Sequence, residues 1–173
     1  MRDLASLSVR EILALAIFLE EERRRMYGDF AEALRDSSPA YAELLDELSC
    51  GGSARRQRLV EFFTRRFGPH IPLVRRNDVR GLTRLKPLWL ARPLTPEVVR
   101  NHVNAIGVEA GNFYIRAAQL GGNAEIRDFL NTFLGDDALS GRGKIPENAS
   151  SSWRKSQGVS WMRRLVGWIR CIE

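Results

Sequence analysis

Histidine and cysteine are scarce in this chain. Its 173 residues include two histidines, His70 and His102, and two cysteines, Cys50 and Cys171. Two histidines exclude a histidine-rich metal site, and the wide cysteine spacing excludes the paired-cysteine motifs of zinc and redox sites. Low cysteine usage is typical of proteins from a reducing compartment. We therefore expect a cytoplasmic setting.

Long apolar runs are also missing. No run approaches the ~18 residues that a transmembrane helix requires. The N-terminal stretch MRDLASLSVREILALAIFLEEE contains a short apolar patch, but it has no small-residue cleavage site and its acidic flank is unlike a signal peptide. With 44% hydrophobic residues, the chain can still bury a core of domain size. Peripheral contact with the inner membrane is the alternative location.

Positive charge dominates, and its distribution is uneven. The formal net charge is +6, and basic residues outnumber acidic ones between positions 55 and 100 and again from 141 onward. Such patches can attract nucleic acid or anionic lipid, although a solvated surface is the commoner explanation. Nucleic acid is the least favoured partner, because the patch lacks interleaved aromatic residues for base stacking.

Two long helices are predicted in the first 70 residues. The first, 9–35, begins with a capping box of Ser8 and Glu11, and its apolar residues repeat with a 3.6-residue period. The second, 40–67, follows Pro39 and ends at Gly68. Its middle contains LSCGGSARRQRL, where each glycine weakens the helix by about 1 kcal/mol relative to alanine.

A long connection separates this pair of helices from a second pair. Prolines in 68–94 exclude a long helix there, although a short one at 78–85 is compatible with the sequence. The third helix is expected from its N-cap Thr95 to about 120, and a fourth follows Asn123 until Gly135 interrupts it. A long crossover allows its flanking helices to run parallel. The pattern predicts an all-α, ferritin-like four-helix bundle with a long crossover between helices 2 and 3.

Bundles of this connectivity can hold two iron or manganese ions. The ligands are one glutamate from each of two helices and a Glu-x-x-His pair from each of the other two. Carboxylates suit these hard cations, and the spacing of three places glutamate and histidine on the same helix face. A complete site would therefore show a glutamate on helices one and three and Glu-x-x-His on helices two and four.

Three stretches resemble a known family. LALAIFLEEERRRMYGDFAEAL and NAIGVEAGNFYIRAAQ resemble the first and third helices of rubrerythrin-type ferritin-like domains. The stretch from RLVEFFTRRFGPHIPLVRRNDVRG to KPLWLARPL is similar to the second helix and crossover of membrane-bound ferritins, in which this domain precedes a vacuolar-iron-transporter-like membrane domain. The resemblance covers about residues 8–150. It implies a ferritin-like domain at 1–150, a di-iron cofactor, ferroxidase or peroxide chemistry, and a homodimer.

Carrying the family's ligands onto this sequence leaves the di-iron site incomplete. Glu20, seven residues before Tyr27, matches the first ligand. The remaining ligand positions fall on Gly107 in helix three, on Gly52 and Arg55 in helix two, and in helix four on Gly143 and Pro146 or, in a shorter alignment, on Asp137 and Ser140. Glu109 and Asp137 could assist only from a neighbouring turn. One carboxylate does not hold a hard cation against water with useful affinity.

The surroundings of Glu20 follow from the same placement. Arg55 would point toward the core, so we expect it to pair with Glu20 or to turn outward. In the run EEERRR at 20–25, one acid can face inward, and the rest should form a solvated helical face. His70 is expected to form loop hydrogen bonds, and His102 is expected to be exposed.

Residues 151–173 form a basic amphipathic tail. Trp161, Leu165 and Trp168 repeat at helical spacing with arginines away from the stripe, which is typical of a helix at an anionic membrane surface. Packing onto the bundle and the absence of any selected role are the alternatives. The leading hypothesis is an iron-handling domain by descent with weak or no metal activity. This hypothesis includes the case in which the chain binds no metal. The alternative is a non-catalytic dimerising helical module that binds an anionic membrane surface or a protein partner.

Overall fold

The computed structural model describes residues 1–82 and 94–136, and in these residues it is all-helical without β-strands. Its elements are η1 (Leu4–Ser6), α1 (Val9–Leu34), α2 (Pro39–Phe67), η2 (Arg76–Asp78), α3 (Pro96–Gln119) and α4 (Ala124–Asp136). None of the described helices is long and apolar enough to cross a membrane. The predicted all-α bundle is confirmed.

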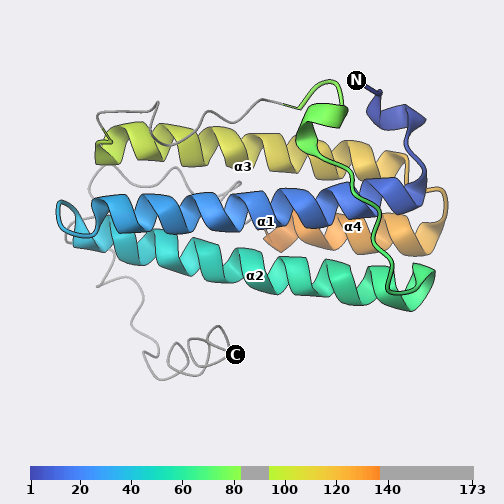
Figure 1. Ribbon diagram of the computed structural model, residues 1–173, viewed down its shortest axis with the longest axis horizontal. Helices are drawn as coiled ribbons and strands as arrows, with labels where there is room; N and C mark the ends of the chain where they lie inside the picture. The colour runs from blue at the N-terminus through green and yellow to red at the C-terminus, as the bar shows by residue number, and fades with distance from the viewer. Residues whose placement is uncertain (83–93, 137–173) are drawn as a thin grey trace.

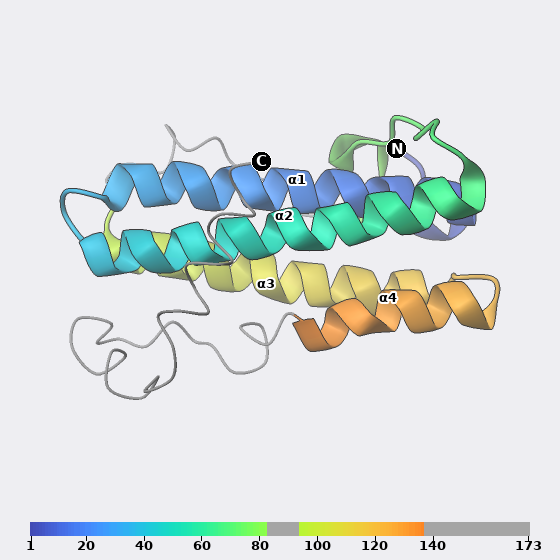
Figure 2. The same cartoon turned by 90° about the horizontal axis from the view of Figure 1, so that it is seen from below.

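The four helices form two antiparallel hairpins, α1–α2 and α3–α4 (Figures 1 and 2). The chain leaves α2 at one end of the bundle and passes across α1 through η2 before α3 begins at the other end (Figure 1). As a result, α2 and α3 run in the same direction, which is the parallel arrangement that the long crossover predicted.

Local sequence signals explain where α1 begins. The Ser8 hydroxyl accepts a hydrogen bond from the backbone N–H of Glu11, and the Glu11 carboxylate accepts one from the backbone N–H of Ser8. Arg2 also donates to Glu11 at 2.6 Å. This bond from Arg2, helped by the Ser8 bonds, lowers the pKa of Glu11 to about 2. The predicted capping box is confirmed.

Two sequence expectations about helix continuity differ in outcome. The glycine pair at 51–52 does not break α2, which is continuous from Pro39 to Phe67. In contrast, the prediction that Gly135 interrupts the fourth helix was wrong, because α4 extends through it to Asp136. The 3₁₀ turn η2 ends where the optional helix at 78–85 was expected to begin, and residues 83–85 lie outside the described part of the chain.

The core is divided into two apolar clusters along the bundle. One contains the N-terminal half of α1, ending at Leu19, together with residues of α2, α3 and α4. The other begins on α1 at Tyr27 and includes residues from the opposite halves of α2 and α3. On α1, the gap between them holds two buried charged residues, Glu20 and Arg23, which are 1% and 3% exposed. The candidate site lies in this gap.

Candidate functional site

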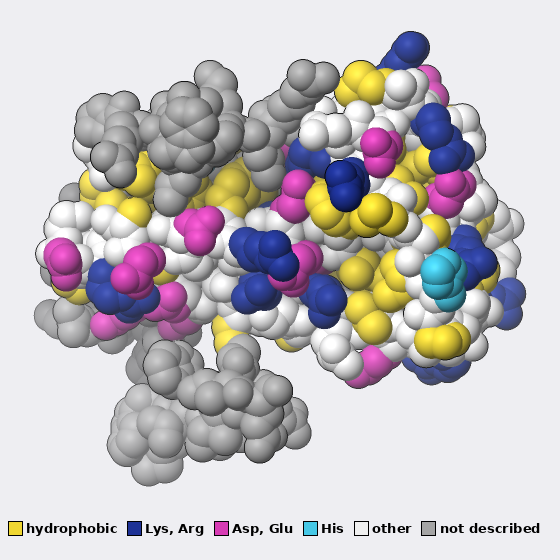
Figure 3. All heavy atoms as spheres, viewed as in Figure 1, with side chains coloured by type: hydrophobic (Ala, Val, Ile, Leu, Met, Phe, Trp, Pro, Cys, Tyr) yellow, Lys and Arg dark blue, Asp and Glu magenta, His cyan; other side chains and the backbone are white. Residues whose placement is uncertain are grey.

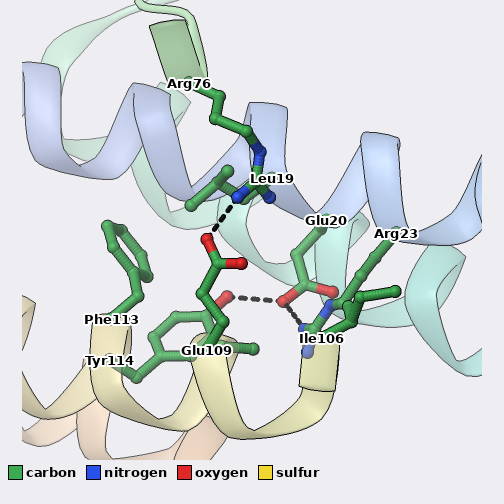
Figure 4. A pocket seen from close by; sticks show the side chains of 9 residues that line it. Leu19, Glu20, Arg23, Arg76, Ile106, Glu109, Phe113 and Tyr114 are labelled. Atoms are coloured by element: carbon green, nitrogen blue, oxygen red, sulfur yellow. Dashed lines mark hydrogen bonds and ion pairs between the residues drawn. The ribbon is translucent and has the colours of Figure 1, made fainter. Parts of the chain in front are cut away.

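The carboxylate of Glu20 is the centre of a buried hydrogen-bond network. Its Oε1 accepts from Arg23, one turn later on α1, and from the Tyr114 hydroxyl of α3 at 2.7 Å (Figure 4). Its Oε2 accepts from Nε of Arg55 on α2 at 3.1 Å. Three helices therefore converge on one carboxylate, and each of its oxygens is engaged.

A second set of ion pairs lies beside the first. Arg76 of η2 donates to Glu22 of α1 at 2.7 Å and also to Glu109 of α3. The Arg76 side chain is only 8% exposed. The turn is fixed because the Asp78 carboxylate accepts from the backbone N–H of Arg75. The crossover thereby places the positively charged side chain of Arg76 between α1 and α3.

A small cavity connects the two sets. Glu20, Arg23, Arg76, Glu109 and Tyr114 contribute to its wall, together with apolar residues of α1 and α3 (Figure 4). Its volume is about 20 Å³, which is room for about one water molecule. The carboxylates of Glu20 and Glu109 face the same space, but each is already bonded to a guanidinium.

The helix-two ligand positions have other roles in the structure. Arg55 pairs with Glu20, which is the first of the two alternatives expected from the sequence. Gly52 is buried where α2 meets α1, and a Cβ there would lie 3.3 Å from the Cβ of Arg24. A glycine at 52 thus allows the close helix approach from which Arg55 reaches the carboxylate.

The other predicted positions contribute no ligand group in the described residues. Gly107 lies on α3, half-buried and without a side chain. Glu109 does reach the cavity, as the neighbouring-turn alternative suggested, but there it binds Arg76. The helix-four candidates all lie outside the described residues. These candidates are Asp137, Ser140, Gly143 and Pro146.

Two arginines of the network were missed by the sequence reasoning. Arg23 was assigned to a solvated face, yet its side chain is 4% exposed. Its spacing of three from Glu20 was the available signal, because residues i and i+3 share a helix face. Arg76 gave no comparable signal, since its partners are 54 and 33 residues away in sequence.

The two histidines lie away from this centre. His70 is exposed in the crossover, where its carbonyl oxygen accepts from Arg10 at 2.6 Å. His102 was expected to be exposed, and this was wrong: it is half-buried, with Nδ1 2.9 Å from the Val98 carbonyl and its ring edge-on to Phe30. A helical histidine near an aromatic core residue can bury its ring while bonding its own backbone.

Outside the network, α1 carries a partly solvated ion-pair face. Acidic and basic side chains lie close together over this helix (Figure 3). Hydrogen bonds from Arg24, and then from Arg25, lower the pKa of Glu21 to about 2, although burial acts in the opposite direction. For Glu21, which retains 24% exposure, this part of the EEERRR prediction is confirmed. Glu22, which is 29% exposed, instead joins the central ion pairs through Arg76.

Comparison with known proteins decides the family. The rubrerythrin family model matches residues 11–136, which is most of the chain. The chain belongs to the rubrerythrin family. No curated protein and no solved structure gives a match. The rubrerythrin match spans α1 to α4 and therefore includes every residue of the buried network.

The central residues do not fit the di-iron centre expected of a rubrerythrin. That centre needs glutamates and Glu-x-x-His pairs from four helices. Within residues 1–82 and 94–136, no group of three or more His, Cys, Asp or Glu side chains is placed to hold a metal ion. The oxygens of Glu20 are instead bonded to two guanidiniums and a phenol. A cation there would have to displace these donors and lie next to their positive charges.

Proposed function

We propose that this chain is a rubrerythrin-family domain without di-iron chemistry, which acts as a non-catalytic, self-associating helical module. The observation that carries the proposal is the state of Glu20, the one matching ligand. It is 1% exposed, and Arg23, Arg55 and Tyr114 occupy the directions from which metal ions would approach.

Charge balance supports this proposal. The centre holds three carboxylates, Glu20, Glu22 and Glu109, and three guanidiniums, Arg23, Arg55 and Arg76. Buried carboxylates without a counter-charge raise one another's pKa and destabilise the fold. In a metal centre the cations remove that cost. Here the arginines supply an equal positive charge from within the chain.

A second candidate is weak iron binding, of the kind expected if this chain descends from the membrane-bound ferritin branch. The observation in its favour is that Glu20 and Glu109 face one cavity. Iron would then be held by a carboxylate pair after Arg76 and Arg23 move away. The cost of separating those arginines from buried carboxylates makes this arrangement the weaker one.

Metal analysis of the purified full chain, grown with added iron, separates the two candidates. We expect much less than one iron per chain, no acceleration of ferrous iron oxidation, and no difference between the natural chain and Glu20→Gln in either assay. Two irons per chain, lost in Glu20→Gln, would show that the di-iron function persists. About one iron per chain, lost in both Glu20→Gln and Glu109→Gln, would support the carboxylate-pair candidate.

For partners, the proposal is a second copy of this chain, together with an anionic membrane surface contacted by residues 151–173. The membrane contact rests on the amphipathic pattern of the tail alone. Liposomes containing anionic lipid should retain the full chain and release a chain that lacks residues 153–173. Equal retention of the two chains would rule out membrane binding by the tail.

A further inference from the structure

The crossover between α2 and η2 exposes a large apolar side chain. From Leu73 to Arg76 the side chains alternate between exposed and buried, which is the pattern of an extended chain. Leu73 is 72% exposed, the highest value among the large hydrophobic residues of the described chain, whereas Val74 is 6% exposed. The same alternation exposes Arg75. An apolar and a basic side chain therefore lie together on the outer side of segment 71–75.

Hydrogen bonds hold the chain on both sides of this segment. After it, the backbone N–H of Arg2 donates to the Asp78 carbonyl at 2.7 Å, and that of Arg80 donates to the Arg2 carbonyl at 2.8 Å. Before it, the Arg10 side chain donates to the His70 carbonyl at 2.6 Å. The exposure of Leu73 is thus imposed by the fold, so that binding through this side chain requires little further ordering.

A second exposed apolar side chain lies at the same place. Met1 is 61% exposed and lines the same surface pocket as Leu73, together with Leu7 and Pro72. Hydrophobic side chains gather on the right half of the face shown in Figure 3, with basic side chains around them. The two most exposed large hydrophobic residues of the described chain therefore share one site, which distinguishes them from singly scattered surface residues.

Positive charge is in excess around this site. Residues 65–82 include five arginines and one acid, Asp78. Three exposed arginines of this stretch have no carboxylate partner in the described part of the chain: Arg65, Arg75 and Arg80. The exposed arginines of α1 differ, because Arg25 lies 2.7 Å from a carboxylate oxygen of Glu21 and Arg35 lies 3.3 Å from one of Asp46.

We propose that segment 71–75 docks on an anionic membrane surface, with Leu73 inserted among the lipid headgroups and Arg75 and Arg80 bound to their phosphates. This inference rests on the membrane partner in the proposed function and adds a contact on the bundle to the one made by residues 151–173. One leucine and two arginines give marginal binding by themselves. Joined to the tail in one chain, they strengthen its binding and orient the bundle.

A membrane fits this site better than a protein or a nucleic acid. A specific protein partner needs a complementary surface of about 800 Å², whereas a lipid surface accepts a single protruding side chain and its neighbouring cations. Nucleic acid binds through stacking aromatic side chains, and none is exposed in residues 1–82 and 94–136. The pocket carboxylate of Glu11 is bonded to Arg2 and does not offset the excess of positive charge.

Vesicle flotation of the full chain tests the inference. The vesicles are phosphatidylcholine with added phosphatidylglycerol, or phosphatidylcholine alone, to which binding should be much weaker. Leu73→Glu should weaken binding to the anionic vesicles roughly tenfold or more, because an apolar contact is replaced by a repelled carboxylate. The double change Arg75→Gln and Arg80→Gln should weaken it about 25-fold, or about fivefold for each arginine.

Two controls match these changes in net charge. Val108→Glu alters another apolar residue, 60% exposed on α3, and should leave binding nearly unchanged. The double change Arg25→Gln and Arg35→Gln removes two arginines that already pair with carboxylates, and it should also have little effect. Because Leu73 is exposed, Leu73→Glu should keep the melting temperature of the natural chain.

Hydrogen exchange locates the contact. Anionic vesicles should slow exchange of the backbone amides at 73–75 in the full chain and leave those of α4 unchanged. Unchanged exchange at 73–75 in chain that is bound to vesicles would overturn the inference.

The vesicle results separate this inference from the tail contact. If the natural chain binds neither vesicle, the membrane partner itself is wrong, while the loss of iron chemistry is unaffected. If deletion of residues 153–173 releases the chain but Leu73→Glu binds as Val108→Glu does, the tail acts alone and the inference fails. If the deleted chain stays bound and Leu73→Glu releases it, segment 71–75 is the main contact and the tail contact is wrong.

Two further results would refute the choice of an anionic membrane. Equal binding to the two kinds of vesicle would exclude a role for Arg75 and Arg80. If the double change at these arginines weakens binding to immobilised polyglutamate but leaves vesicle binding intact, the surface serves an acidic protein instead.

Discussion

The most direct test of the buried network is Glu20→Gln, which keeps the shape of the side chain and removes its negative charge. In the native protein this carboxylate accepts hydrogen bonds from Arg23, Arg55 and Tyr114. After the change, two guanidiniums would share one neutral amide oxygen, and the amide nitrogen would face them as a competing donor. The guanidinium of Arg23 would lose the most stabilisation, because this residue is 3% exposed and its charge cannot be hydrated instead.

The size of the effect follows from the burial. Removing one partner of a buried ion pair costs about 3–5 kcal/mol, because the remaining charge is left uncompensated. We expect a value near the lower limit, since Arg55 is 12% exposed and can rotate toward solvent. For a chain of this length the corresponding fall in melting temperature is roughly 6–20 °C.

The assay is urea unfolding followed by circular dichroism, with and without a strong chelator. Glu21→Gln is the matched control on the same helix, and its loss should stay within about 1 kcal/mol because its ion pairs are partly solvated. The chelator should change neither the natural chain nor the variants. The reasoning would be refuted if Glu20→Gln matched the control, or if the chelator destabilised the natural chain as much as the substitution does.

Three further changes test individual contacts. Tyr114→Phe removes the hydrogen bond to Glu20 and keeps the ring, so calorimetry should show a loss of about 1.5–3 kcal/mol; a neutral result would mean that the bond does not form. Gly52→Leu should cost about 1–3 kcal/mol by overpacking against Arg24, whereas a stabilised variant would contradict the close helix contact. The folded pKa of Glu21 is about 2 against an ordinary 4.5, so its ion pairs stabilise the fold above about pH 4.5 and lose this effect as the pH falls toward 2. Urea midpoints of the natural chain and Glu21→Gln should therefore converge on acidification, and a constant difference would disprove the assignment.

The helices and their ends could be predicted from the sequence because the signals that fix them are local. The Ser8 capping box and the N-cap Thr95 each act within one helical turn, and the structure shows both. The error at Gly135 has a local explanation too. A glycine destabilises a helix by about 1 kcal/mol relative to alanine. In α4 the neighbouring residues offset this cost at Gly135, and in α2 the neighbouring residues offset it at Gly51 and Gly52.

The central network could be predicted only in part, because most of its members come from distant segments. Placing Glu20 and Arg55 on facing helices predicted that Arg55 either pairs with Glu20 or turns outward, and the structure has the pairing. Arg23 was assigned to solvent because it lies in a run of charged residues, although its spacing from Glu20 indicated burial. Arg76 depends on the path of the crossover over α1, and no periodic pattern reports such a path.

These contacts also explain why glycine and arginine occur together where a metal ligand pair is expected. A guanidinium reaches farther than an imidazole and carries a permanent charge. Arg55 neutralises Glu20 from α2, and Gly52 permits α2 to lie close to α1 beside Arg24. Residues 52 and 55 are then coupled: a larger residue at 52 would separate the helices and weaken the 3.1 Å contact between Arg55 and Glu20. In a metal-dependent bundle the cation couples folding to ion supply, whereas here the counter-charge is part of the polypeptide and is present whenever the chain folds.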